Sequence, residues 1–207
     1  MFPLILGATV LILAIAEPAE YGTSDYILSR LMGSSTGTVL FAMLMGIFLS
    51  ADLAGNRCMR SAPLAKALLT RDVPLFFTAL TTLYSLIASV VYAACVISRG
   101  GELSDAADFV IISACTVLVC TIMAIIAVNS RYGFVLLIYV YLPLVAIILL
   151  IPRSVKMNGF GLSLGAAAGI FAAAVAVTAV AGIALSTLLY RKLNFRPTVT
   201  AAEMSQM

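Results

Sequence analysis

The sequence contains no histidine and no tryptophan among its 207 residues, and only 10% of its side chains are charged. Histidine is the usual base of nucleophilic catalysis and the commonest metal ligand. Serines are present, but none within an apolar segment has a lysine beside it that could replace such a base. We therefore expect no enzymatic activity in this chain.

Two motifs of nucleotide and ion transport are also absent. The chain has no G-x-x-x-x-G-K-[ST] sequence, so it is not expected to bind ATP through a phosphate-binding loop of that kind. It has no T-V-G-Y-G sequence, which forms the filter of potassium channels.

The scarcity of charge excludes an ordinary soluble domain, in which about a quarter of the residues are charged. The mean hydropathy is +1.14. Five segments without charge are each long enough to cross a bilayer core, which takes roughly 20 helical residues; a sixth, 1–16, is shorter. Since such runs are too long for barrel strands, we predict an all-α integral membrane protein. Its single domain, 1–207, would contain six transmembrane helices at about 2–16, 38–54, 74–97, 109–129, 133–151 and 161–190.

The first apolar segment has a second interpretation. Ala14-Ile15-Ala16 resembles a signal-peptidase site, but no Lys or Arg precedes Arg30, and signal peptides begin with positive charge. We treat the segment as a first span.

The distribution of charge predicts the orientation. Eight of the twelve basic residues fall on one side of the predicted spans: Arg57, Arg60, Lys66, Arg71, Arg131, Arg191, Lys192 and Arg196. The other side holds most of the acidic residues: Glu17, Glu20, Asp25, Glu102, Asp105 and Asp108. Because basic residues mark the cytoplasmic side, we expect both termini in the cytoplasm and the acidic loops outside.

The loop between the second and third spans predicts a short helix of its own. Ser61 suits an N-cap and Pro63 a first turn. Leu64, Leu68 and Leu69 then share one face, with Lys66, Thr70 and Arg71 elsewhere. This pattern favours an amphipathic helix on the inner membrane surface, with Pro74 opening the third span.

The third span carries many hydroxyl groups. Those of Thr81, Tyr84, Ser85, Ser89 and Tyr92 are candidates for lining a translocation path. The alternative is that Ser and Thr bond to carbonyls of their own helix, which they commonly do in membranes. No carboxylate falls near the centre of a predicted span, which argues against a self-powered proton antiporter.

The sixth span contains small residues at four-residue intervals: Gly161, Gly165, Gly169 and Ala173. Such spacing lets a neighbouring helix approach closely, and that helix could belong to this chain or to a second copy. Cys95, Cys115 and Cys120 also lie inside spans, where a thiol behaves as a small hydrophobic group. The cysteine spacings fit no metal site.

Taken with six spans and a basic cytoplasmic helix, three local sequences carry a family resemblance. They are Arg60-Ser61-Ala62-Pro63-Leu64, Arg131-Tyr132-Gly133 leading to Tyr141-Leu142-Pro143, and Leu189-Tyr190-Arg191-Lys192. The chain resembles the ABC-2 type membrane subunits of ATP-binding-cassette exporters, especially the small permeases of bacterial peptide and antimicrobial exporters such as the phenol-soluble modulin exporters. It departs from them in having Ala62-Pro63 for Leu-Pro, and no basic amphipathic segment before the first span.

The resemblance implies a permease subunit in the bacterial cytoplasmic membrane that forms the path for an amphipathic peptide or hydrophobic compound. Cytoplasmic ATPase subunits would bind ATP and magnesium, a second permease copy or a paralogue would complete the path, and nucleic acid would not be a partner. Residues of the cytoplasmic helix would couple the permease to the ATPase: Arg57, Arg60, Pro63, Lys66 and Arg71. Ordinary positive-inside anchoring explains each basic residue alone equally well.

Two other functions remain open. Substrate-binding subunits of energy-coupling-factor vitamin importers also have six spans in about 200 residues and dock a partner through small-residue helix faces, which 161–173 would supply. A membrane scaffold without transport activity is the third.

Overall fold

The computed structural model describes residues 64–98, 102–129 and 158–192, with single positions at 100, 146, 150, 152 and 155. This part of the chain is all-helical, and three helices are long and apolar enough to cross a membrane: Ala65–Ser98, Leu103–Ile126 and Leu164–Tyr190. They coincide with the predicted spans 74–97, 109–129 and 161–190. The predicted spans 2–16 and 38–54, nearly all of 133–151, and the predicted coupling residues Arg57, Arg60 and Pro63 lie outside the described residues.

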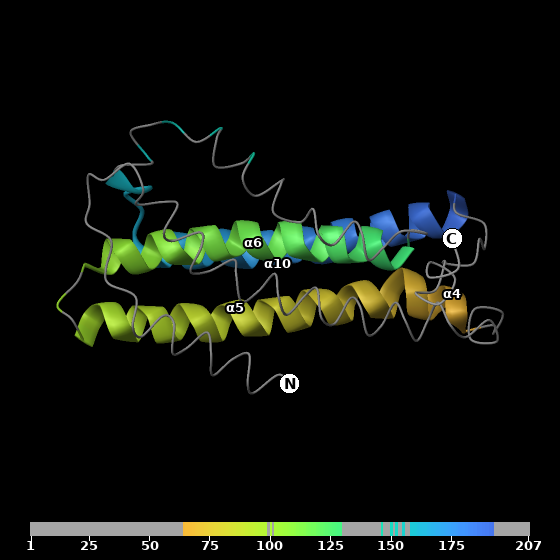
Figure 1. Cartoon of the computed structure of the whole chain (residues 1–207), viewed down its shortest axis with the longest axis horizontal. Helices are drawn as coiled ribbons and strands as arrows, with labels where there is room; N and C mark the ends of the chain where they lie inside the picture. Colours follow the sequence, from red (N-terminus) through yellow and green to blue (C-terminus); the bar gives the residue numbers. More distant parts are fainter. Residues whose placement is uncertain are drawn as a thin grey trace, which may run out of the picture.

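Helices α5 (Val73–Ser98) and α6 (Leu103–Asn129) form an antiparallel hairpin (Figure 1). At about 1.5 Å per residue, the 26 residues of α5 extend about 39 Å, which exceeds a hydrocarbon core of about 30 Å. The turn between them uses Gly100, whose φ of 72° is a backbone conformation that favours glycine. The Gly100 amide donates to the carbonyl of Ile97 at 3.1 Å, which closes the end of α5.

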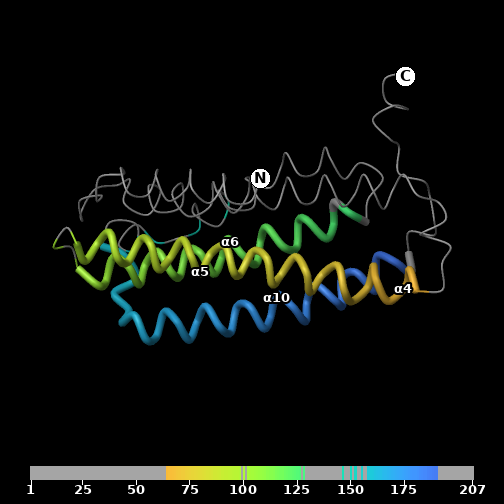
Figure 2. The backbone as a smooth tube through the Cα atoms, turned by 90° about the horizontal axis from the view of Figure 1, so that it is seen from below, coloured from red at the N-terminus to blue at the C-terminus, as the bar shows by residue number. Residues whose placement is uncertain are grey.

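Helix α6 is the central helix of the described part. It lies beside α5 in Figure 1 and beside α10 (Leu164–Lys192) in Figure 2. Its buried residues include Val117 and Ala124, and it is the most enclosed of the three apolar helices. Helix α10 is the least enclosed, and it runs parallel to α6, so that the ends of α6 and α10 meet the start of α5.

Helix α5 continues a helix that begins earlier in the chain, at Ala65. A single turn, α4 (Ala65–Ala67), leads into a π-helical turn, η1 (Leu68–Asp72), and both are continuous with α5. The Val73 amide donates to the carbonyl of Leu68, five residues earlier. Proline has no amide to donate and its ring clashes with the carbonyl four residues back, so a wider turn before Pro74 lets the helix continue. The separate surface helix predicted around Pro63–Arg71 is therefore wrong over its described residues.

The side chains of α5 are distributed as expected for a helix in lipid. Its exposed face carries large apolar residues, among them Leu83, Leu86 and Val90, while Thr81 and Ser85 are buried. Water-soluble helices show the opposite distribution, because their apolar face forms the core. Hydroxyls that face the bundle and aliphatic groups that face outward are typical of a helix surrounded by hydrocarbon.

The start of α6 differs from the prediction. The helix begins at Leu103, six residues before the predicted 109, and it includes Asp105 and Asp108. The sequence predicts an external loop for both carboxylates, whereas in the structure both are buried. The structure supplies each with a hydrogen-bond donor, and carboxylates in the first turns of a helix are favoured by the helix dipole.

Candidate functional site

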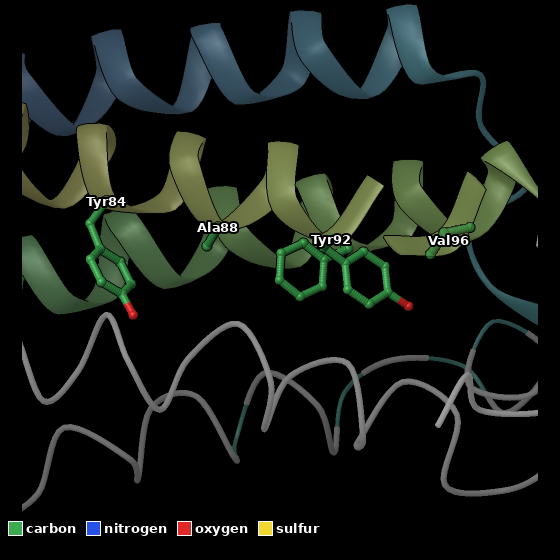
Figure 3. Close-up of a cluster of buried hydrophobic side chains, with 5 residues drawn as sticks. Tyr84, Ala88, Tyr92 and Val96 are labelled. Carbon is green, nitrogen blue, oxygen red and sulfur yellow. The ribbon is translucent and has the colours of Figure 1, made fainter. Parts of the chain in front are cut away.

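The candidate path residues lie on one buried face of α5. Thr81, Tyr84, Ser85, Ser89 and Tyr92 are each less than 9% exposed. Tyr84, Ala88, Tyr92 and Val96 point to the same side of α5, away from α10 (Figure 3). Their burial alone does not distinguish a path from a packed interior.

The threonines on this face satisfy their hydroxyls within the helices. Thr78 donates to the carbonyl of Pro74 at 2.9 Å, and Thr81 donates to the carbonyl of Phe77 at 2.8 Å. The Thr81 hydroxyl also lies 3.0 Å from that of Thr121, which joins α5 to α6. For Thr81, the interpretation as a helix-bonded hydroxyl thus accounts for the geometry.

Three other small hydroxyls of the same helix behave differently. The oxygens of Thr82, Ser85 and Ser89 are buried and have no hydrogen-bond partner within the part of the chain that the structure describes. The residue exposures of Ser85 and Ser89 are 1% and 7%. Each lies three or four residues from the next, so the three oxygens form a line along α5, called here the hydroxyl stripe.

Tyr92 lies near the C-terminal end of α5, where it contacts the buried carboxylate of Asp105. Its hydroxyl donates to Asp105 Oδ2 at 2.8 Å, and its ring stacks on Phe109 with centroids 4.2 Å apart and an interplanar angle of 12°. The hydrogen bond and the stacking fix both ends of the tyrosine side chain, so Tyr92 joins α5 to the first turns of α6.

Asp108 connects α6 to the segment that precedes α10. Its Oδ1 accepts a hydrogen bond from the Phe160 amide at 2.9 Å. Gly159 has a φ of 75°, and a Cβ at this position would overlap the Asp108 carboxylate. Only glycine satisfies both conditions, because any side chain would meet the carboxylate and strain the backbone. Sequence reasoning missed this contact, although the Asp-x-x-Asp spacing directly before an apolar run could have indicated a helix N-terminus.

The close helix contact is made by a different glycine from the ones predicted. Gly161 precedes α10, and Gly161, Gly165 and Gly169 are exposed, with open space where a Cβ would stand. The helix that we expected to pack on them is therefore not among the described residues. Gly182 is buried instead, and a Cβ there would lie 2.9 Å from Ile125 Cδ1 of α6 and 3.5 Å from Pro74 Cβ of α5. The three helices meet at Gly182.

The predicted coupling residues Lys66 and Arg71 are exposed at the beginning of the long helix Ala65–Ser98. Arg71 Nε contacts Asp72 Oδ1 at 3.0 Å, with 68% of the arginine side chain exposed. On the opposite face, Leu69 packs in a cluster with Val73 and Phe77 of the same helix, Ala124 and Val128 of α6, and Tyr190 of α10. The basic segment is thus fixed to all three helices.

No cluster of three potential metal ligands occurs among the described residues. Comparisons with protein-family models, with curated proteins and with solved structures found no match to this chain.

Proposed function

We propose that the chain is the permease subunit of an ATP-binding-cassette exporter of the ABC-2 type, with six spans and both termini in the cytoplasm. A separate ATPase, which binds ATP and magnesium, drives it, and a second permease copy or paralogue completes the path in a bacterial cytoplasmic membrane. The cargo is an amphipathic peptide or a hydrophobic compound.

The observation that carries the proposal is that the basic segment is rigidly connected to the apolar helices. Lys66 and Arg71 are exposed on a helical segment that continues into α5 without a break. A force on this segment is transmitted along the helix and, through Leu69, to α6 and α10. A permease driven from the cytoplasm requires such a rigid connection, whereas residues that only anchor the chain to lipid headgroups do not.

The test is co-purification in mild detergent with the cassette ATPase that we expect to be encoded beside this gene. We expect Lys66→Glu/Arg71→Glu to release the ATPase, because the double variant reverses both exposed positive charges of the described basic segment. Glu102→Lys is the matched control, since Glu102 is also exposed but lies beyond the opposite end of α5. Wild-type protein that purifies without an ATPase would refute the proposal.

A second candidate is the substrate-binding subunit of an energy-coupling-factor importer. The exposed glycines of α10, Gly165 and Gly169, favour it, because nothing in the described part of the chain covers them. Such a subunit would co-purify with a membrane-embedded coupling protein, and Gly165→Leu/Gly169→Leu would release that protein. The exporter subunit would keep its ATPase in this double variant.

A further inference from the structure

The hydroxyl stripe of Thr82, Ser85 and Ser89 is an exception within a helix that otherwise satisfies its polar groups. Leaving a buried hydroxyl without a partner costs about 1–3 kcal/mol in free energy. Three such groups within eight residues of one helix therefore represent a substantial cost. Water or a polar group of a ligand that binds these oxygens would offset this cost.

The helical periodicity defines the position of the stripe. Residues advance by about 100° each, so the stripe falls on one flank of Thr81 and Tyr84 falls on the other. Thr81 faces Thr121 of α6, and Tyr84 points away from α10 (Figure 3). The stripe accordingly lies beside Thr81, next to the contact of α5 with α6.

The hydroxyl groups of α5 also differ in chemistry. Tyr92 donates its hydroxyl to Asp105 and stacks on Phe109, so its polar atom is already engaged. The hydroxyls of the stripe have neither kind of contact within the described residues. Each retains a donor and an acceptor site that a small polar group could use.

We propose that Thr82, Ser85 and Ser89 line a water-accessible polar path along α5, in which their hydroxyls bind water and the hydroxyl or amide groups of the cargo. The use of the path by cargo rests on the proposed exporter function, whereas its hydration does not. Of the five candidate path residues, this assigns Ser85 and Ser89 to the path and leaves Tyr92 to the structural contact with α6.

The competing arrangement is a dry interior. A rotation about χ1 would let each hydroxyl bond to the carbonyl four residues earlier, as Thr78 and Thr81 do. The experiment must therefore distinguish a hydrated stripe from a dry one, and it must do so without an identified cargo.

The test measures labelling by a charged, membrane-impermeant methanethiosulfonate reagent on the full chain in open membrane fragments. Ser85→Cys and Ser89→Cys are introduced into a chain whose four cysteines are replaced by alanine. Val90→Cys is the matched control, because Val90 is 67% exposed on the outward, apolar face of the same helix. Lys66→Cys and Glu102→Cys, both exposed near the ends of α5, show that the reagent reaches the protein.

We expect the Ser85→Cys and Ser89→Cys thiols to react at least about tenfold faster than the Val90→Cys thiol. Only a thiolate reacts, and each unit by which a water-free environment raises a thiol pKa lowers the thiolate fraction about tenfold. Labelling as slow as that of Val90→Cys would overturn the proposal.

A second measurement decides the matter if the cysteine-free chain does not fold. Ser85→Cys, Ser89→Cys and Val90→Cys are made with the native cysteines, and the labelling of each in excess of that of the wild type is measured with the same reagent. Excess labelling of Ser85→Cys and Ser89→Cys that is at least about tenfold faster than that of Val90→Cys supports the proposal, and excess labelling that is no faster overturns it. Both measurements are independent of the ATPase, so their failure is distinct from failure of the exporter assignment.

Discussion

At the scale of single residues, the contact of Gly159 with Asp108 shows how a buried carboxylate fixes a loop. Asp108 accepts a hydrogen bond from the Phe160 amide, and the absence of a side chain at Gly159 leaves space for the carboxylate. The adjoining glycine, Gly161, also has a positive φ, of 63°, but nothing described lies near it. Both glycines therefore have a positive φ, but only Gly159 lies against the carboxylate, so the cost of the backbone conformation can be separated from that of the close contact.

We expect Gly161→Ala to lower the free energy of unfolding by about 1–2 kcal/mol, the cost of a positive φ for a residue with a Cβ. Gly159→Ala should cost about 1–3 kcal/mol more, because the methyl group also displaces the Asp108 carboxylate. Unfolding in detergent monitored by circular dichroism measures both variants. Equal losses would mean that the carboxylate does not press against the loop.

Tyr92 allows a second test at this scale. Tyr92→Phe keeps the ring that stacks on Phe109 and removes only the hydroxyl that donates to Asp105. Since the acceptor is a buried carboxylate, we expect a loss of about 1.5–3 kcal/mol in the free energy of unfolding. The control is a double-mutant cycle with Asp105→Asn. If the two losses simply add, the hydroxyl and the carboxylate do not interact.

At the scale of the helices, the sequence predicted the apolar centre of each described helix well and its ends less well. The predicted end of the span 74–97 lies one residue before the end of α5, but the helix begins at Ala65, nine residues before the predicted start, because the π-helical turn lets it continue past Pro74. The start of α6 lies six residues before the predicted one, because charged residues such as Asp105 and Asp108 normally indicate a loop. Their partners, Tyr92 and Phe160, are distant in sequence, so no local pattern could show that the carboxylates are satisfied.

The same limitation explains why the sequence did not predict which glycine of α10 contacts its neighbours. Regular glycine spacing drew attention to Gly161, Gly165 and Gly169, whereas α10 closely approaches its neighbours at Gly182, which has no second glycine four positions away. Regular spacing shows that one face of a helix consists of small residues, but only the packed structure shows which face contacts a neighbouring helix. The hydroxyls of α5 are similar: the sequence shows that the span is rich in them, but only the structure separates the bonded Thr81 from Ser85 and Ser89.

The contact at Gly182 gives a prediction about helix packing. Gly182→Leu would place a side chain against Ile125 and Pro74, so we expect it to separate α10 from α5 and α6, at a cost of about 1–3 kcal/mol. Gly165→Leu is the matched control on the same helix, where the space is open. Melting temperatures in detergent test both. A control variant as unstable as Gly182→Leu would show that another helix packs over Gly165.

At the scale of the whole molecule, the described helices have different charge at their two ends. Lys66, Arg71 and the end of α10 at Lys192 lie at one end, and Glu102, Asp105 and Asp108 lie at the other. An apolar length of about 39 Å separates the two ends along α5, given its 26 residues. The positive-inside rule predicts that the basic end of the bundle faces the cytoplasm, which is where the proposed ATPase would act.

This orientation predicts opposite accessibility for two exposed residues at the ends of the α5 helix. In a Cys58→Ser background, an impermeant thiol reagent should label Glu102→Cys in intact cells and Lys66→Cys only in inverted vesicles, because the helix between them crosses the bilayer. Labelling of both residues from one side would show that Ala65–Ser98 does not cross the membrane. Labelling with the sides exchanged would place Lys66 and Arg71 outside the cell. Coupling to a cytoplasmic ATPase through these residues would then be impossible, however strongly the basic segment is fixed to the three helices.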